Sequence, residues 1–209
     1  MKEKWNQVVV ATRNPHKVKE LAAIFQAEWG LSVIGLEGLG VPEVVEDGNT
    51  FEANAIKKAK VASQFLQCPV IADDSGLEVD ALHGAPGVLS ARYAGPDAED
   101  WENNKKLLQA LKGVPKEKRG ATFVCVMAFA TPDGMIRTVR GTCTGWITDQ
   151  PRGTHGFGYD PLFYLPELGC TMAELSPAEK NRISHRAQAV QKLIRLLKEE
   201  KVFTNPERT

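Results

Sequence analysis

The chain lacks the cysteine spacing of a disulfide-stabilised or zinc-binding domain. Its 209 residues include four cysteines, and no two of them form a C-x-x-C pair. The four histidines are also far apart in sequence; the residues concerned are Cys68, Cys125, Cys143, Cys170, His16, His83, His155 and His185. We therefore expect reduced, mostly buried thiols, as in a cytoplasmic protein, and no zinc site.

The chain also lacks a long N-terminal apolar run and an excess of either charge. The run over residues 8–11 is too short for a signal peptide or a membrane span. Lysine plus arginine and aspartate plus glutamate each number 26, so the basic excess of a nucleic-acid coat is missing. We expect a cytoplasmic protein that binds neither membranes nor nucleic acid. A local cluster of cations for a phosphorylated small molecule remains compatible with this balance.

Two common nucleotide-binding signatures are missing as well, G-x-x-x-x-G-K-[ST] and G-x-G-x-x-G. What is present is a buried strand over residues 8–11, then a short polar turn and a helix that ends at Gly30. Asn14 is typical of an N-cap and Pro15 of the first helical position. Donors from Thr12, Asn14 and Lys17 at this helix start suit a triphosphate. A capped helix with a surface lysine is the alternative.

A pair of acids ends another apolar run, at residues 70–74. We predict a strand that stops on Asp73 and Asp74 and turns at Ser75-Gly76, which places carboxylates at the edge of a sheet where ligands bind. Successive strand residues face opposite ways, so the two acids can serve one Mg²⁺ site only if the chain bends there. Glu46, which precedes the helix expected to start at Thr50, is a third candidate ligand. The alternative is an acidic turn.

The remaining pattern predicts an α/β fold with a mixed sheet, because a hairpin follows three strand–helix pairs. Helices are expected from Thr50 to about Leu66, from Asp97 or Asp100 to Gly113, after the Ser176 capping box and after Ser184. Strands are expected at residues 31–35, 121–130, 135–147 and 162–165. We also expect an irregular region at residues 77–96 and a frayed end at 204–209. With 43% hydrophobic residues, the chain suits one domain over residues 1–209.

Two further segments have residues suited to binding a base. Residues 157–161, Phe-Gly-Tyr-Asp-Pro, offer a stacking face and a hydrogen-bond acceptor, although a turn with core aromatics is the alternative. His185 and Arg186 begin the last helix, where the helix dipole disfavours cations, which suggests that they are placed for a ligand. Lys180 and Lys58 are either ligand contacts or ordinary solvated lysines.

Taken together, these strings resemble one family, the inosine triphosphate pyrophosphatases, which hydrolyse deaminated purine nucleoside triphosphates. The matching segments are residues 9–17, 50–59, 71–77, 84–93, 156–161 and 173–186. The resemblance implies an elongated mixed α/β sheet with flanking helices, two lobes around a deep cleft, a Mg²⁺ requirement and a homodimer. It also implies that ITP, dITP and XTP are cleaved to the monophosphate and pyrophosphate, by water attack at the α-phosphorus.

The resemblance further implies roles for individual residues. Glu46 and Asp74 would be metal ligands with Asp73 close by, and Asp74 would also be the general base. The phosphates would contact Thr12, Arg13, Asn14, Pro15, His16, Lys17, Lys58 and Ser75, and the base would contact Phe157, Gly158, Tyr159, Asp160, Lys180, His185 and Arg186. Many family members have glycine at the position of Arg13, and often at that of His16.

Other functions are compatible with parts of this pattern. A Mg²⁺-dependent pyrophosphatase for pyrimidine nucleotides would share the phosphate and metal residues, but the Ser184-His185-Arg186 string argues against it. A nucleotide-binding module without catalysis would not need Asp74 near a metal. A Ser-His-Asp hydrolase has little support, since Ser75 does not lie in a G-x-S-x-G motif.

Overall fold

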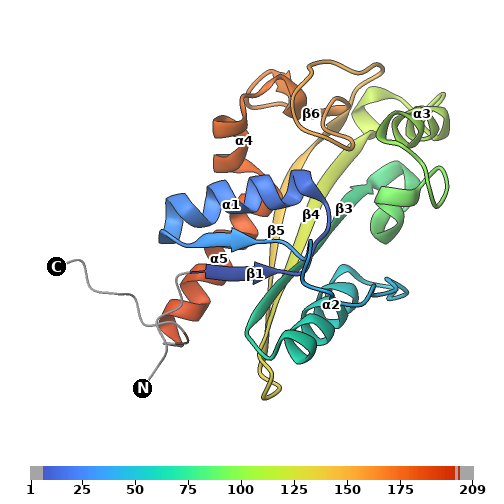
Figure 1. Ribbon diagram of the computed structural model, residues 1–209. Helices are drawn as coiled ribbons and strands as arrows, with labels where there is room; N and C mark the ends of the chain where they lie inside the picture. The colour runs from blue at the N-terminus through green and yellow to red at the C-terminus, as the bar shows by residue number, and fades with distance from the viewer. Residues whose placement is uncertain (1–6, 201, 203–209) are drawn as a thin grey trace. The chain divides into compact units, whose positions relative to one another are not determined.

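The computed structural model describes residues 7–200 and 202 (Figure 1). Seven strands form one sheet in the order β2-β1-β3-β4-β5-β6-β7. This confirms the predicted α/β class with flanking helices. The tail at 204–209, for which we expected fraying, lies outside the described residues. Within the described part of the chain, every helix is too short or too polar to cross a bilayer.

The first strand–helix pair follows from its local sequence. β1 (Gln7–Val10) is followed by α1 (Pro15–Trp29), with Asn14 as N-cap and Pro15 in the first turn. Gly30 ends α1 in the left-handed conformation that glycine adopts most easily, at φ 68°. β2 (Ser32–Ile34) then pairs with β1 in parallel.

The second pair places its helix on the opposite face of the sheet from α1. α2 (Phe51–Leu66) is capped by Thr50, and β3 (Val70–Val79) pairs with β1 in parallel. α1 leads from β1 to β2 at one side, and α2 leads from β2 across β1 to β3, so right-handed connections put the two helices on opposite faces. The chain reverses its direction of travel across the sheet between β1 and β3, the kind of position where α/β proteins bind ligands.

The predicted end of β3 is wrong. The strand does not turn at Ser75-Gly76 but continues to Val79, so residues 77–79 are also strand rather than part of an irregular region. β3 lies between β1 and β4, and pairing with neighbours on both sides outweighs the local turn preference of Ser-Gly. The rest of the predicted irregular region contains two short 3₁₀ helices, Asp80–Leu82 and Gly87–Arg92.

The later elements match the predicted order. They are α3 (Asp100–Ala110), a 3₁₀ turn (Lys116–Lys118), β4 (Gly120–Ala130), β5 (Ile136–Ile147), β6 (Phe163–Leu165), β7 (Cys170–Thr171), a 3₁₀ turn (Met172–Glu174), α4 (Pro177–Ile183) and α5 (His185–Glu199). The short strand β7 was not predicted. α3 begins with a Glu99–Glu102 capping box and ends before Leu111, slightly earlier than the expected Gly113.

The residues group into two compact units. One contains residues up to 74, 126–141 and those from 187 onward, and its core includes Phe25 and Leu193. The other contains 75–125 and 142–186, with a core that includes Leu107, Leu162 and Phe163. Candidate site residues occur in both units.

Candidate functional site

The first group, the Phe157 cluster, consists of Phe157, Asp160, Lys180 and Arg186. The Phe157 ring has the Lys180 ammonium 4.8 Å and the Arg186 guanidinium 5.6 Å from its centroid. Both distances are typical of cation–π attraction. Arg186 is only 1% exposed, which is unusual for arginine. The cluster therefore combines an aromatic face with two cationic donors.

Asp160 orients this cluster through one carboxylate oxygen. Its Oδ2 accepts hydrogen bonds from the Phe157 backbone N–H at 2.9 Å and from Lys180 Nζ at 2.5 Å. A Cβ at Gly156 would collide with the same carboxylate, and Gly156 has a φ of 76°. A glycine is therefore needed where the loop passes Asp160.

The residues beside the Phe157 cluster differ in where their side chains lie. His185 is buried and stacks on Phe123, with ring centroids 4.8 Å apart. Tyr159 is 4% exposed, packs in the hydrophobic core and donates its hydroxyl to the Ser90 carbonyl at 2.8 Å. This burial raises the pKa of the Tyr159 phenol. The Tyr159 side chain thus supports the loop from within the core, as in the alternative that we gave for these aromatics.

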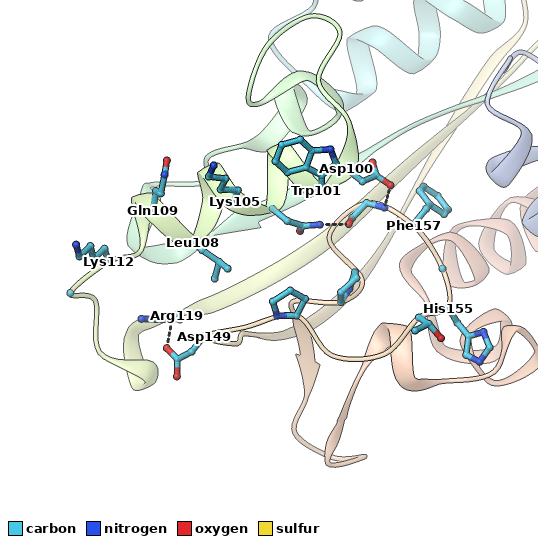
Figure 2. A pocket seen from close by; sticks show the side chains of 17 residues that line it. Asp100, Trp101, Lys105, Leu108, Gln109, Lys112, Arg119, Asp149, His155 and Phe157 are labelled. Atoms are coloured by element: carbon cyan, nitrogen blue, oxygen red, sulfur yellow. Dashed lines mark hydrogen bonds and ion pairs between the residues drawn. The ribbon is translucent and has the colours of Figure 1, made fainter.

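A pocket of about 800 Å³ borders this loop, as Figure 2 shows. Its wall includes α3 residues, among them Asp100 and Trp101, and the loop residues Phe157 and Gly158. The Gly158 N–H donates to Asp100 Oδ2 at 2.6 Å, and Asn104 Nδ2 donates to the Gly158 carbonyl at 2.9 Å. Neither Asp100 nor Asn104 was among the predicted site residues, because the sequence shows only that they lie one turn apart on a predicted helix.

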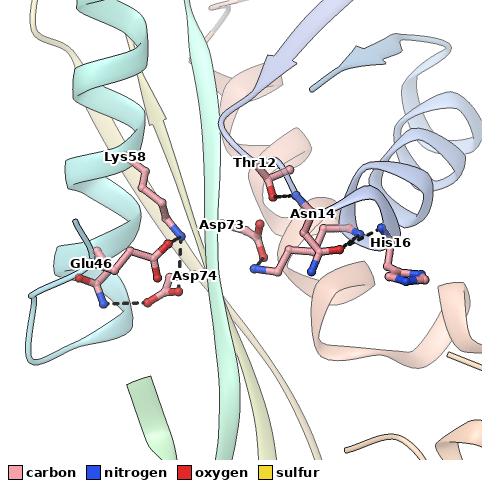
Figure 3. A network of polar contacts seen from close by, with 9 residues as sticks. Thr12, Asn14, His16, Glu46, Lys58, Asp73 and Asp74 are labelled. Atoms are coloured by element: carbon pink, nitrogen blue, oxygen red, sulfur yellow. Dashed lines mark hydrogen bonds and ion pairs between the residues drawn. The ribbon is translucent and has the colours of Figure 1, made fainter. Parts of the chain in front are cut away.

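The second group, the carboxylate–lysine cluster, consists of Lys17, Glu46, Lys58, Asp73 and Asp74 (Figure 3). Val10 of β1 pairs with Ile71 of β3, so the two acids of β3 lie just beyond the end of β1, where the chain enters α1. Alternate strand residues face opposite ways. Figure 3 shows the Asp73 side chain on the α1 side of β3 and the Asp74 side chain on the α2 side.

On the α1 side, Asp73 forms an ion pair with Lys17. Lys17 Nζ lies 2.9 Å from Asp73 Oδ2, and the Asp73 side chain is fully buried. Asn14 Oδ1 accepts hydrogen bonds from the backbone N–H groups of His16 at 2.9 Å and Lys17 at 3.2 Å. The N-cap thus already satisfies two of the donors that we expected to face an anion.

The turn before α1 is further fixed by Thr12 and Arg13. The Thr12 hydroxyl accepts from the Asn14 N–H at 3.1 Å, and Arg13 Nη2 donates to the Val41 carbonyl. Arg13 therefore binds the segment before α2 with its guanidinium.

On the α2 side, Lys58 joins two carboxylates. Its Nζ lies 2.8 Å from Glu46 Oε1 and 3.5 Å from Asp74 Oδ1. Asn54, one turn earlier on α2, donates to Asp74 Oδ2 at 3.1 Å and accepts from the Gly48 N–H at 2.8 Å. Asn54 was not among the predicted site residues, although it is a polar residue within the apolar stripe of α2. Ser75 follows Asp74 on β3 and is partly buried.

Burial and neighbouring charges shift the pKa values of two members. Burial raises the pKa of Asp74, and the Glu46 charge acts in the same direction, against Lys58, Lys17 and the Asn54 hydrogen bond. Burial alone would lower the pKa of Lys58, but Asp74, Asp73 and Glu46 raise it above its ordinary value. A carboxyl with a raised pKa that is kept partly desolvated suits proton transfer.

The cluster offers two carboxylates to one cation position. Within the described residues, no three or more histidine, cysteine, aspartate or glutamate side chains lie close enough together to hold a metal ion. Glu46 and Asp74 nevertheless converge on one positive charge, the Lys58 ammonium. Mg²⁺ binds to proteins through one or two carboxylates, with water and substrate phosphates as its other ligands. The donor set therefore fits a divalent cation, with Asp73 turned to the other side.

Comparison with known proteins finds relatives that cover nearly the whole chain. The model of the Ham1 family matches residues 8–196. A dITP/XTP pyrophosphatase of Geobacillus kaustophilus is 56% identical over 90% of this chain and 92% of that protein. The Ham1 protein of Staphylococcus aureus superposes with a TM-score of 0.82 at 45% identity, over 93% of this chain and all of that one. A HAM1 protein from Coxiella burnetii superposes with a TM-score of 0.83 at 42% identity, over 92% of this chain and 98% of that one.

These matches span nearly all of the chain. Their sequence identities are well above those of proteins that share a fold but not a related chemistry. They confirm the resemblance that was inferred from the six sequence segments. The chain belongs to the Ham1 family.

Proposed function

We propose that this protein hydrolyses deaminated purine nucleoside triphosphates, among them dITP, ITP and XTP, to the monophosphate and pyrophosphate. Its family membership and the names of its relatives support this activity. The observation that supports it most directly is the convergence of Glu46, Lys58 and Asp74 beside the end of β1. Carboxylates and ammonium groups at such a position suit a phosphorylated substrate and its metal ion.

The phosphate side of the reaction is assigned to the carboxylate–lysine cluster. Lys17 and Lys58 supply positive charge for the triphosphate, with Thr12, Asn14 and Ser75 as hydrogen-bonding neighbours and residues 13, 15 and 16 shaping the turn. Glu46 and Asp74 would hold Mg²⁺, which neutralises phosphate charge and lowers the pKa of bound water. Asp73 holds Lys17 at 2.9 Å and so orients it.

Asp74 is the proposed general base for the attacking water. Its Oδ2 is oriented by Asn54 at 3.1 Å, and its Oδ1 lies near Lys58, so the carboxylate has one defined position. Attack of water at the α-phosphorus breaks the bond to the bridging oxygen, the water proton passes to Asp74, and pyrophosphate leaves. Phosphoryl-group chemistry depends mainly on positioning and charge neutralisation.

The base side is assigned to the Phe157 cluster and His185. The Phe157 ring would stack on the purine, and donors from His185, Arg186 and Lys180 would face a 6-keto oxygen. Asp160 fixes Lys180 and the Phe157 backbone. An adenine amino group would leave a buried donor unsatisfied, at a cost of roughly 1–3 kcal/mol. Selectivity against ATP follows from that cost.

We also propose that the protein is a cytoplasmic homodimer. The exposed Leu89, in the second 3₁₀ helix, makes residues 82–93 a candidate dimer surface. Sedimentation of the purified protein tests the oligomeric state, and a monomer at micromolar concentration would contradict it.

The activity is tested by pyrophosphate release from ITP, XTP, GTP, ATP and dTTP, each with Mg²⁺ and with EDTA. We expect fast Mg²⁺-dependent release from ITP and XTP, and little from ATP. Release of orthophosphate would mean attack at the γ-phosphorus and would contradict the proposal. Tight nucleotide binding without hydrolysis would instead identify a binding module.

A further inference from the structure

Both peptide groups of Gly158 are bound by side chains of one helix. Asp100 Oδ2 accepts from the Gly158 N–H at 2.6 Å, and Asn104 Nδ2 donates to the Gly158 carbonyl at 2.9 Å. The two side chains lie four residues apart on α3, which places them on one face of that helix. They therefore contact the loop as a pair.

Packing contributes little to the position of Gly158. It has no side chain, its φ is 61°, and a Cβ built on it would meet no atom within 4 Å. Gly158 borders the pocket of about 800 Å³, so open space rather than packed side chains lies beside its Cα. The two hydrogen bonds from α3 therefore hold Gly158, while the buried Tyr159 anchors the residue that follows it.

The helix itself is firmly held. Arg119 donates from Nη2 to the carbonyl of Leu111, the C-cap of α3, at 3.3 Å, and from Nε to the Val114 carbonyl in the following turn at 2.9 Å. Near the other end, Asn103 accepts from the Ala94 N–H at 2.8 Å and donates to the Ala91 carbonyl at 3.2 Å. Leu107 is fully buried between these two anchors.

The contacts at Gly158 act on the neighbouring Phe157. Asp160 holds the Phe157 N–H at 2.9 Å, and α3 holds the next residue through both of its peptide groups. The Phe157 ring, between these anchors, is the face toward which Lys180 and Arg186 point. We propose that Asp100 and Asn104 are positioning residues for base recognition, because they bind the backbone of Gly158, the residue next to the Phe157 ring. This inference rests on the proposed function.

The test replaces single atoms in these side chains. Asn104→Asp exchanges the donor that faces the Gly158 carbonyl for an oxygen, so attraction becomes repulsion with no change in shape. We expect KM for dITP to rise about tenfold or more, kcat to stay within about threefold, and inhibition by pyrophosphate to be unchanged. Gln109→Glu is the matched control, since it makes the same exchange at an exposed position on the same helix and pocket wall.

A second pair of variants keeps the test decisive if Asn104→Asp does not fold. Asp100→Ala removes the acceptor for the Gly158 N–H and should raise KM for dITP several-fold. Asp100→Asn retains an acceptor oxygen and should recover most of that loss. If Asp100 acted only through its charge, Asp100→Asn would behave like Asp100→Ala, and the proposal would be overturned.

A merely structural role predicts a different pattern. It would lower Tm and the active fraction, and so kcat, with KM for dITP unchanged, or it would weaken dITP and pyrophosphate by the same factor; either result overturns the proposal. If the wild-type protein releases no pyrophosphate from any nucleotide, the proposed function fails. The same variants are then compared by calorimetric Kd for dITP in Mg²⁺, and an unchanged Kd in Asn104→Asp overturns the positioning role.

Discussion

The carboxylate–lysine cluster and the Phe157 cluster are held in place by different means. In the first, charged side chains of α1, α2 and β3 pair directly, as in Lys17–Asp73 and Lys58–Asp74. In the second, the Lys180–Asp160 ion pair is joined by an aromatic ring on a glycine-containing loop, whose backbone N–H groups donate to Asp160 and Asp100. The first means is suited to the triphosphate that every nucleotide shares, and the second to the base that distinguishes one nucleotide from another.

The largest expected effect comes from the first cluster. Asp74→Asn removes the proposed general base while the Asn54 and Lys58 neighbours remain, and should lower kcat about a thousandfold, within the range for general-base groups. Asp47→Asn is the control, because Asp47 is an exposed acid that pairs with Lys57 at 2.6 Å on the surface. Pyrophosphate release measures both variants. Near-normal turnover by Asp74→Asn would exclude the base role.

A smaller effect is expected when Lys17 is replaced, and it should raise KM by the same factor whatever base the nucleotide carries. Lys17→Met removes a charge proposed for the triphosphate, and a lost charge-assisted contact of about 1.5–3 kcal/mol corresponds to a rise in KM of about ten- to a hundredfold. The factor should be the same for dITP, XTP and ATP. Lys57→Met, at an exposed lysine, should leave KM unchanged.

If the KM factor for Lys17→Met instead differed strongly between dITP and ATP, the division of roles between the two clusters would be wrong. The variant should also unfold at lower denaturant concentration, because it leaves the buried Asp73 without its ion pair. Measurement below the unfolding range separates this effect from binding.

His185→Ala should act on base selectivity. Loss of one donor and of the stacking contact with Phe123 should raise KM for ITP about five- to tenfold and narrow the preference for ITP over ATP. Inhibition by pyrophosphate should stay as in the wild type, since no base is involved. His155→Ala, at an exposed histidine, is the control. An unchanged ITP preference in His185→Ala would remove His185 from the base site.

The smallest expected effect concerns stability and pH. Because burial and the Glu46 charge raise the pKa of Asp74, the folded state holds the carboxyl proton of Asp74 more strongly than the unfolded chain does. The favourable contribution of Asp74 is complete below its unfolded pKa and is lost as pH rises through the folded pKa. In EDTA, the stability of Asp74→Asn relative to wild type should therefore increase as pH rises from the unfolded pKa through the folded pKa of Asp74.

Urea unfolding of both proteins across that range measures the difference. Asp74→Asn leaves the Lys58 charge without one of its partners, but this charge is constant over these pH values. It therefore changes the unfolding free energy by the same amount at every pH. A difference in unfolding free energy that does not vary with pH would contradict the raised pKa.

The parts that the sequence predicted well are those that depend on local signals. The Asn14, Thr50 and Ser176 caps and Pro15 specify helix starts within a few residues, and all four are found in those roles. The length of β3 could not be predicted in this way, because strands on both sides override the Ser75-Gly76 turn signal. Where the local sequence pattern and the neighbouring strands favoured different structures, the neighbouring strands determined the length of β3.

The site shows the same division. The phosphate-side candidates were readable because acids and a capped helix follow strands along the sequence. The burial of His185 and Arg186 was not readable, since it depends on Phe123 and Phe157, which are far away in sequence. Asn54 and Asn104 were missed because a single asparagine on a helix becomes informative only when its partner, Asp74 or Gly158, is known.

The adjacent acids of β3 also affect how the sheet assembles. A one-residue slip of a strand exchanges its two faces. If β3 slipped one way, Ser75 would replace Asp74 opposite Lys58; if it slipped the other way, Ala72 would replace Asp73 opposite Lys17. The first slip would leave Lys58 with Glu46 alone, and the second would leave Lys17 without its carboxylate. Breaking a buried ion pair by removing one partner costs about 3–5 kcal/mol. The two adjacent carboxylates therefore also disfavour a shifted alignment of β3.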